Sequence, residues 1–193
     1  MKPIRSDYQT SDLTMRGFAK SSQDDSVINL TYGEPAQPTP ACVKDEAIRR
    51  IQNDETLYSN ANGIQELRET ISDFYQRLYG VRFDRDDIII TTGSTQSLTA
   101  TLLTILDPGD EVIIPTPCFM LYQPSVEFAH GTVVEYSTVH DDFQLNREHL
   151  EALITPRTKA IFYTSPQNPT GVCYTQASQA ILIELAQKYG LYI

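Results

Sequence analysis

The segment Thr91–Ala100, TTGSTQSLTA, places a glycine and several hydroxyl side chains directly after an apolar run. We expect a helix to begin here, and the first turn of a helix leaves backbone N–H groups without intrahelical partners. Those N–H groups, the helix dipole and the hydroxyls of Ser94 and Thr95 could bind an anion such as a phosphate. Either hydroxyl could instead only cap the helix. The segment lacks the lysine of GxxxxGK[ST] and the three glycines of a dinucleotide fingerprint.

Two further loops each present one side chain suited to a flat polar ligand. Phe119 follows two prolines in PTPCF, where its ring could stack on a ligand ring or pack into the core. Asn168 lies in TSPQNPTG, Thr164–Gly171, and its amide can both donate and accept hydrogen bonds. The two prolines of this loop would stiffen it, and either X–Pro bond could be cis. A tight structural turn capped by Asn168 is the alternative interpretation.

Two weaker candidates lie nearer the N-terminus. Tyr58, in LYSNANG, could donate its phenolic hydroxyl to an anion, although an exposed or half-buried tyrosine is the commoner outcome. Gly33, in LTYGEPAQPTP, would let a ligand approach the bare backbone, or it could belong to an irregular lead-in to the next helix.

The elements that must position these residues alternate between strands and helices. Apolar runs predict strands over residues 87–91, 111–115, 132–136, 159–164 and 191–193. Helical spacing and end signals predict helices over residues 40–53, with Thr39 as N-cap, 64–79, closed by Gly80, 94–106, 119–130, 147–154 and 176–189, closed by Gly190. This order indicates an α/β fold, a mainly parallel sheet with helices on both faces. Because ligands of such sheets bind at the carboxyl ends of the strands, we expect the three loops to form one site.

Composition limits the function classes. The 193 residues carry 25 acidic and 15 basic side chains, a formal net charge of −10, which argues against a broad nucleic-acid or anionic-membrane surface. The three cysteines, Cys42, Cys118 and Cys173, are far apart and form no CxxC pair. They favour a reducing cytoplasm over a disulfide framework, and we predict no metal site. The N-terminus has no apolar signal core, and no apolar stretch is long enough to cross a membrane.

Taken in order, the segments GEP…PTP, YSNANGIQELRETISDFY, IIITTGSTQSL, LDPGDEVIIPTPCF and ITPRTKAIFYTSPQNPTG resemble the pyridoxal-phosphate aminotransferases of fold type I, the class I/II aspartate-aminotransferase-like group. The resemblance covers residues 27–193. It implies that these residues form part of the large cofactor-binding domain. Residues 1–26 are polar and weakly patterned, and we expect an arm or a short helix there. The resemblance also implies pyridoxal 5′-phosphate as cofactor, amino acid and 2-oxo acid substrates, and a homodimer.

The same resemblance implies a role for each candidate residue. Phe119 matches the aromatic residue stacked on the pyridine ring, and Asn168 matches the asparagine that hydrogen-bonds the ring's phenolic oxygen. Tyr58 matches the tyrosine that reaches the phosphate of the neighbouring subunit. Gly33 matches a backbone position near the substrate carboxylate. The family's phosphate cup corresponds to Ser94, Thr95 and Gln96.

The chain departs from the family where its catalytic residues should follow. The acid against the pyridine nitrogen, the Schiff-base lysine, a second basic phosphate ligand and the arginine for the substrate carboxylate would all come after Ile193. Lys159 lies on a strand before its loop and does not match the lysine's motif. We therefore expect an N-terminal portion of an aminotransferase, incomplete at its C-terminus and inactive alone.

Two alternatives stay open. A pyridoxal-phosphate-dependent carbon–sulfur β-lyase of the same fold would share the phosphate and ring contacts. A non-catalytic protein, either a truncated relic or a regulator's ligand-sensing domain, is the other, although residues 1–26 are too short for the DNA-binding segment of a regulator. The residues do not select one amino acid as substrate.

Overall fold

The computed structural model describes Ile28, Gly33 and residues 35–193. Its contacts divide the chain into two compact units, one ending at Ile90 and the other beginning at Thr91. The boundary expected between residues 26 and 27 lies outside the described residues.

Helices make up the regular structure described in the first unit. They are α2 (Ala41–Gln52), α3 (Gln65–Tyr79) and the 3-10 helix η2 (Arg85–Asp87). Both predicted α-helices are confirmed, and α3 ends as expected at Gly80, whose φ of 69° is left-handed. The start of α2 differs by one residue, because Pro40 rather than Thr39 is the N-cap and makes no side-chain capping bond.

The strand predicted over residues 87–91 is wrong. The carboxylate of Asp84 accepts a hydrogen bond of 2.9 Å from the N–H of Asp86, which starts the 3-10 turn of η2. Residues 88–90 continue without joining a sheet, and Ile90 donates only one bond, of 3.0 Å, to the carbonyl of Asn62. An apolar run becomes a strand only where a partner strand completes its hydrogen bonds.

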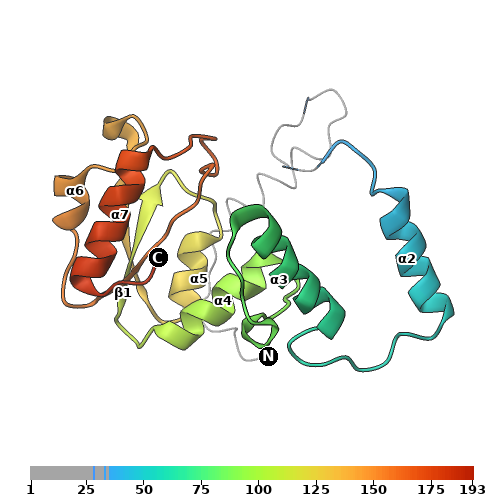
Figure 1. Ribbon diagram of the computed structural model, residues 1–193. Helices are drawn as coiled ribbons and strands as arrows, with labels where there is room; N and C mark the ends of the chain where they lie inside the picture. The colour runs from blue at the N-terminus through green and yellow to red at the C-terminus, as the bar shows by residue number, and fades with distance from the viewer. Residues whose placement is uncertain (1–27, 29–32, 34) are drawn as a thin grey trace, which may run out of the picture. The chain divides into compact units, whose positions relative to one another are not determined.

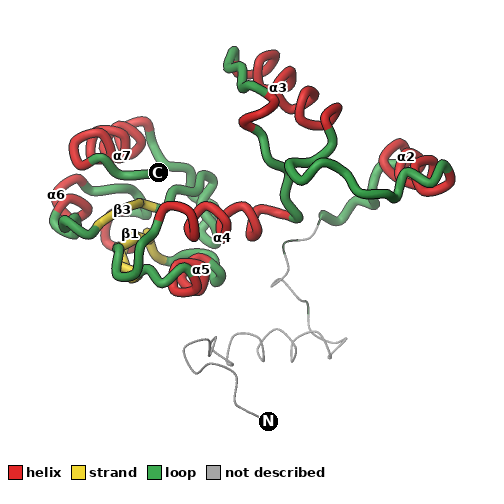
Figure 2. Tube along the Cα trace, turned by 90° about the horizontal axis from the view of Figure 1, so that it is seen from below, coloured by secondary structure: helices red, strands yellow, loops and turns green. Residues whose placement is uncertain are grey.

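The second unit is a three-stranded parallel sheet between two layers of helices. The strands are β1 (Glu111–Thr116), β2 (Thr132–Ser137) and β3 (Thr158–Ile161), in the order β2-β1-β3. The helices are α4 (Gly93–Ile105), α5 (Tyr122–Phe128), α6 (Arg147–Glu151), α7 (Gln176–Tyr189) and the 3-10 helix η3 (Val139–Asp141). Figures 1 and 2 show α6 and α7 on one side of the strands and α4 and α5 on the other. The predicted fold class is confirmed.

The central strand β1 has apolar side chains on both faces of the sheet, so both faces must be covered by helices. Ile113 points into a cluster with residues of α6 and α7, including Leu150 and Leu185. Val112 and Ile114 point the other way, into a cluster that includes residues of α4 and α5. All three β1 side chains are 0 % exposed, so this strand reads as a continuous apolar run rather than an alternating one.

Several predicted boundaries shift in this unit, and the helix expected over residues 147–154 ends at Glu151. The helix expected from Phe119 begins only at Tyr122, whose N–H donates to the Phe119 carbonyl (3.1 Å). β3 ends at Ile161, earlier than expected, although the next N–H still donates to β1. The strand expected over residues 191–193 is reduced to a single parallel bridge between Tyr192 and Ala160. The helix 176–189 and its stop at Gly190 are confirmed.

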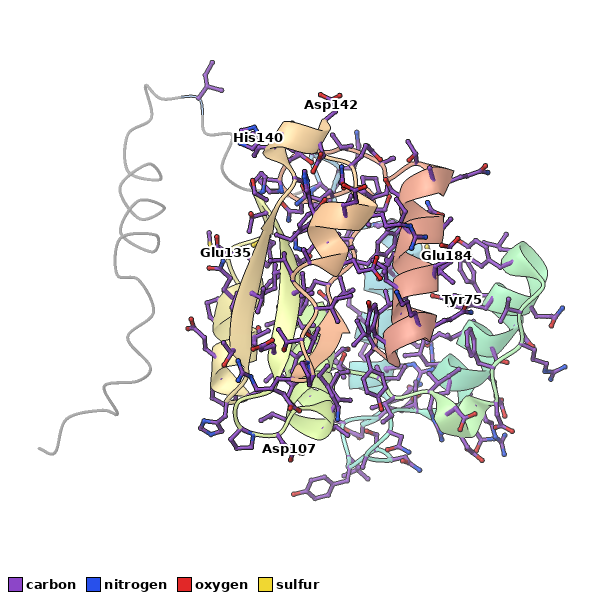
Figure 3. The ribbon with its side chains drawn as sticks, turned by 90° about the vertical axis from the view of Figure 1, so that its left-hand side faces the viewer. Tyr75, Asp107, Glu135, His140, Asp142 and Glu184 are labelled. Carbon is purple, nitrogen blue, oxygen red and sulfur yellow. The ribbon has the colours of Figure 1, made fainter. Side chains whose placement is uncertain are left out.

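The two ends of the sheet carry different loops. Figure 3 shows Asp107, in the turn before β1, at one end, and His140 and Asp142, in the loop after β2, at the other. The loops that follow β1 and β3 leave from the same end as the loop after β2, because the strands are parallel.

A buried carboxylate anchors the opposite end of the sheet. Glu111 begins β1, is 4 % exposed and accepts hydrogen bonds from the Thr155 hydroxyl (2.5 Å) and from Nε of Arg157 (2.9 Å). These donors lower the pKa of Glu111 below its ordinary value of 4.5, and the hydrogen bond from Thr155 has the largest effect. A lowered pKa in the folded state means that ionised Glu111 stabilises the fold above about pH 4.5, and that this contribution is lost as the pH falls through the lowered pKa.

We expect Glu111→Gln to reduce the free energy of unfolding by about 1–3 kcal/mol at neutral pH, because the substitution removes charged hydrogen bonds from a buried site. The variant should also lose less stability than wild type on acidification below about pH 4.5. Urea unfolding across a pH series measures both effects, and Glu127→Gln, at an exposed position of α5, is the control. Equal stability and equal acid dependence of Glu111→Gln and wild type would contradict the anchoring role.

Candidate functional site

A cavity of about 560 Å³ lies in the second unit at the carboxyl end of the sheet. Its lining comes from α4, the loop after β1, the first residue of α5 and the loop after β3. Four of the residues predicted from the sequence line it together: Ser94, Thr95, Phe119 and Asn168. The prediction that the three loops meet is therefore confirmed, while the ligand that they bind stays a prediction.

The start of α4 leaves its hydroxyls available. Gly93 has a φ of 77°, a left-handed conformation that suits glycine and turns the chain into the helix. Thr92 is the N-cap and makes no side-chain capping bond. Within the described part of the chain, the hydroxyls of Ser94 and Thr95 have no hydrogen-bond partner, so the alternative in which they only cap the helix is wrong. Exposed and unpaired at a helix N-terminus, they can bind an anion.

Gln96 has another contact. Its side-chain oxygen accepts a hydrogen bond of 2.6 Å from the backbone N–H of Thr92. Gln96 is absent from the cavity lining, so in this structure its side chain supports the backbone at the helix start.

Phe119 lies at the border between the core and the cavity. Its half-buried ring meets that of Tyr122 edge-on, with centroids 5.5 Å apart and an interplanar angle of 72°. Tyr122 in turn contacts Phe162, with centroids 4.9 Å apart, and its hydroxyl lies 3.1 Å from the hydroxyl of Thr164. The ring of Phe119 is thus supported from one side by the core while it lines the cavity.

Asn168 lies exposed in a tightly closed loop. Gln167 closes the loop with two backbone bonds, from its N–H to the carbonyl of Val172 (2.8 Å) and from the N–H of Gly171 to its carbonyl (2.7 Å). The peptide bonds before Pro166 and Pro169 are both cis, as the sequence allowed. The loop presents the Asn168 amide to the cavity.

Tyr58 and Gly33 belong to the first unit. Tyr58 is fully exposed in the loop before α3. Gly33 is also exposed, and a Cβ added to it would meet no atom within 4 Å.

The sequence interpretation missed Tyr122, Thr164 and Gln167, which support the predicted residues from behind. A signal existed for Tyr122, because it stands three residues after Phe119 in a segment expected to be helical. Gln167 is adjacent to Asn168, but nothing in the local pattern marks a glutamine in a polar loop as buried.

The cavity has little charge of its own. Among the residues that the structure describes, its lining contains hydroxyl, amide, aromatic and aliphatic side chains and no Asp, Glu, Lys, Arg or His. Nearby, burial raises the pKa of the Cys118 thiol, with a smaller contribution from Glu135, and burial raises the pKa of Tyr174 to about 12. At neutral pH both groups stay protonated, so the helix N-terminus is the main positive feature offered to an anion.

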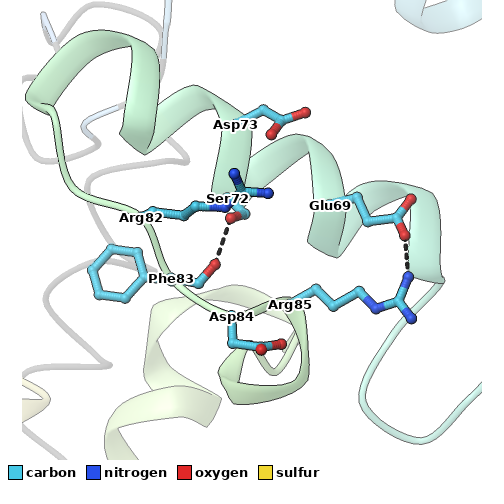
Figure 4. Close-up of a pocket in the computed structure, with 7 residues that line it drawn as sticks. All are labelled: Glu69, Ser72, Asp73, Arg82, Phe83, Asp84 and Arg85. Atoms are coloured by element: carbon cyan, nitrogen blue, oxygen red, sulfur yellow. Dashed lines mark hydrogen bonds and ion pairs between the residues drawn. The ribbon is translucent and has the colours of Figure 1, made fainter.

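A second cavity, of about 440 Å³, lies in the first unit beside α3 and η2. Figure 4 shows its lining, in which Arg85 pairs with Glu69, and the Ser72 hydroxyl donates to the carbonyl of Phe83 (2.5 Å). Asp73 and Asp84 also line it. Three carboxylates against two arginines make this cavity unsuitable for a phosphate dianion.

Two other kinds of site find no support among residues 28, 33 and 35–193. The described residues contain no group of three or more His, Cys, Asp or Glu side chains that could hold a metal ion. None of their helices combines the length and apolar character needed to cross a membrane.

Comparisons with known proteins identify the family of the chain. A family model described as aminotransferase class I and II matches residues 25–193. The chain is 39 % identical over 186 residues to the aspartate aminotransferase of Thermotoga maritima, covering 96 % of this chain and 49 % of the relative. It is also 39 % identical over 168 residues to the aspartate/prephenate aminotransferase of Thermus thermophilus, covering 86 % and 44 %.

The fold comparison gives the same result. The structure of a Thermus thermophilus aspartate aminotransferase mutant complexed with tryptophan aligns with a TM-score of 0.91 at 36 % identity, covering 100 % of this chain and 52 % of that one. The fold is that of the aminotransferase structures that the chain matches. The chain belongs to the class I and II aminotransferase family and spans about half the length of the curated relatives it matches.

Proposed function

We propose that this chain supplies the phosphate cup and the ring platform for pyridoxal 5′-phosphate in an aminotransferase that moves an amino group from an amino acid to a 2-oxo acid. The observation that carries the proposal is the single cavity lined by Ser94, Thr95, Phe119 and Asn168. When bound, the cofactor supplies an electron sink for bonds at the amino acid's Cα.

The residues fit the three parts of the cofactor. The unpaired hydroxyls of Ser94 and Thr95, at the positive end of α4, suit a phosphate. The Phe119 ring suits stacking against a pyridine, and its contact with Tyr122 limits its movement. The Asn168 amide can donate to a phenolate oxygen on that ring. The Phe119 ring is held by its contact with Tyr122 before the ligand arrives, which reduces the ordering cost of binding at this position.

For the first unit we propose two contacts made in the assembled enzyme. Tyr58 would donate its hydroxyl to the phosphate held by a second copy of the chain, in a homodimer. Gly33 would place bare backbone beside the substrate carboxylate. The full exposure of Tyr58 and the open space around Gly33 support these roles.

We propose that these 193 residues do not transfer amino groups alone. In the part of the chain that the structure describes, the lysines are Lys44, Lys159 and Lys188, and none of them lines the cavity. Lys188 pairs with Glu151 at 2.7 Å, and Lys159 lies within β3. A purified 193-residue chain that transfers the amino group of aspartate to 2-oxoglutarate would contradict this proposal.

The names of the relatives favour amino transfer over the carbon–sulfur β-lyase alternative, because the matched proteins are aspartate and aspartate/prephenate aminotransferases. In the complete enzyme, transfer of an amino group to 2-oxoglutarate should exceed release of pyruvate from cystathionine. The reverse order would favour the lyase.

We also propose that residues 27–193 are part of one large cofactor-binding domain, and that residues 1–26 form an arm before it.

A cytoplasmic location is proposed as well. All three cysteines are free thiols, which is the state of cysteine favoured by a reducing compartment.

The test of ring binding compares pyridoxamine 5′-phosphate with inorganic phosphate by calorimetric titration. We expect wild type to bind the pyridoxamine compound more tightly, and Phe119→Ala to lower that affinity by about tenfold, since an aromatic stack contributes on the order of 1 kcal/mol. Phosphate affinity should not change. Phe143→Ala, another half-buried loop phenylalanine of the same unit, is the control. Equal affinity of wild type for both ligands would contradict the proposed site.

A further inference from the structure

We propose that Gln167 is a positioning residue. It connects the loop after β1, which carries Phe119, to the loop that carries Asn168, so that both side chains contact the cofactor ring together. The inference rests on the proposed function and adds a residue to it. Gln167 does not line the cavity that holds the predicted contacts, and its role would be exercised through its neighbours.

The burial of Gln167 is the first observation. It is only 8 % exposed, whereas its neighbour Asn168 is exposed. A buried glutamine must satisfy both its carbonyl and its NH₂ group, so its position is determined by its partners.

The partners of Gln167 lie on two different loops. Its side-chain NH₂ donates to the carbonyl of Pro117, two residues before Phe119 and 50 residues away in sequence. Its side-chain oxygen accepts from the N–H (3.0 Å) and from the hydroxyl (2.6 Å) of Thr170. The Gln167 side-chain amide therefore connects the backbone of the loop after β1 to Thr170, on the far side of the Asn168 loop.

A second link runs parallel to the first. Tyr122 packs edge-on against Phe119, and its hydroxyl lies 3.1 Å from that of Thr164, the residue with which the Asn168 loop begins. A small cavity of about 10 Å³, lined in part by Tyr122, Thr164 and Gln167, separates the two links. This space is close to the least that holds one water molecule, so the region between the loops is almost fully packed.

The coupling has a consequence for ligands. Within one chain the phosphate is proposed to bind at the start of α4, which Gln167 does not touch, whereas the pyridine ring is proposed to need both Phe119 and Asn168 in their correct positions. Loss of the Gln167 link should therefore weaken ring binding and leave phosphate binding unchanged. A purely structural role would lower both affinities together.

The experiment uses the 193-residue chain with pyridoxamine 5′-phosphate and inorganic phosphate as probes, titrated by calorimetry and followed by circular dichroism induced in the bound pyridine ring. We expect Gln167→Leu to lower affinity for the pyridoxamine compound by about tenfold, which corresponds to the loss of one buried hydrogen-bonding group. The induced dichroism should shrink, and phosphate affinity should stay the same. Gln179→Leu is the matched control, because Gln179 also donates its NH₂ to a backbone carbonyl, that of Tyr174 at 3.2 Å.

Gln167→Glu provides a second test, which still applies if Gln167→Leu does not fold. The new carboxylate would face the Pro117 carbonyl, and burial would raise the pKa of that carboxyl group. Below this pKa the protonated acid can donate again. The affinity of Gln167→Glu for the pyridoxamine compound, divided by that of wild type, should rise as the pH falls, while the same ratio for Gln167→Leu stays flat.

The outcomes separate the inference from the proposed function. Unchanged affinity in Gln167→Leu, equal losses for both probes, or no recovery of Gln167→Glu in acid would overturn the positioning role while leaving the site intact. A wild type that binds both probes equally would instead remove the proposed site, and the inference with it.

Discussion

Ser94→Asp is expected to lower affinity for pyridoxamine 5′-phosphate by about 100-fold, which corresponds to about 3 kcal/mol. The new carboxylate would lie at the N-terminus of α4, where the phosphate is proposed to bind, and two like charges about 4 Å apart repel by up to about 4 kcal/mol near a protein surface. No described residue of the cavity lining is a cation that could offset this repulsion. Calorimetric titration measures the loss.

The same substitution should make the fold slightly more stable. A carboxylate in the first turn of a helix interacts favourably with the helix dipole, by about 0.3–1 kcal/mol. Binding and stability are thus expected to change in opposite directions, which no general damage to the fold would produce. Thr104→Asp, at an exposed position near the other end of α4, should lower stability slightly and leave binding unchanged. If Ser94→Asp binds as tightly as wild type, the phosphate does not bind at this helix.

Ile113→Ala is expected to reduce the free energy of unfolding by about 2–5 kcal/mol, the usual cost of truncating a large side chain in a close-packed core. Ile113 is 0 % exposed at the centre of the sheet and packs against Leu150 and Leu185 on the helical layer of α6 and α7. The new cavity would lie between the strand and that layer, where neither can move far because β1 is bonded on both sides.

Chemical denaturation measures this effect, with Ile183→Ala as control. Ile183 lies on α7 but is 50 % exposed, so its truncation should change stability by less than about 1 kcal/mol. A loss at Ile113 no larger than at Ile183 would mean that β1 is not the centre of the core.

The second unit could be predicted well because its signals are local. The apolar run of β1 and the stop of α7 at Gly190 each follow from residue types at fixed positions, and the structure confirms them. The meeting of the three loops also followed, because parallel strands place their carboxyl ends at one edge of a sheet.

The features that escaped prediction depend on residues far apart in sequence. The run at residues 88–90 has the composition of a strand but no partner within the described structure, and composition cannot supply one. The burial of Gln167 depends on a carbonyl 50 residues away. The contact between the Gln96 side chain and the backbone of Thr92 is local, and the place of Gln96 in the phosphate cup stays a prediction.

The most direct measurement is a crystal structure of the chain with pyridoxamine 5′-phosphate. We expect the phosphate within hydrogen-bond distance of the Ser94 and Thr95 hydroxyls, the pyridine ring against Phe119, and the Asn168 amide beside the phenolic oxygen of the ring. A ligand bound instead in the charged cavity between α3 and η2, or a phosphate placed away from the start of α4, would contradict this expectation.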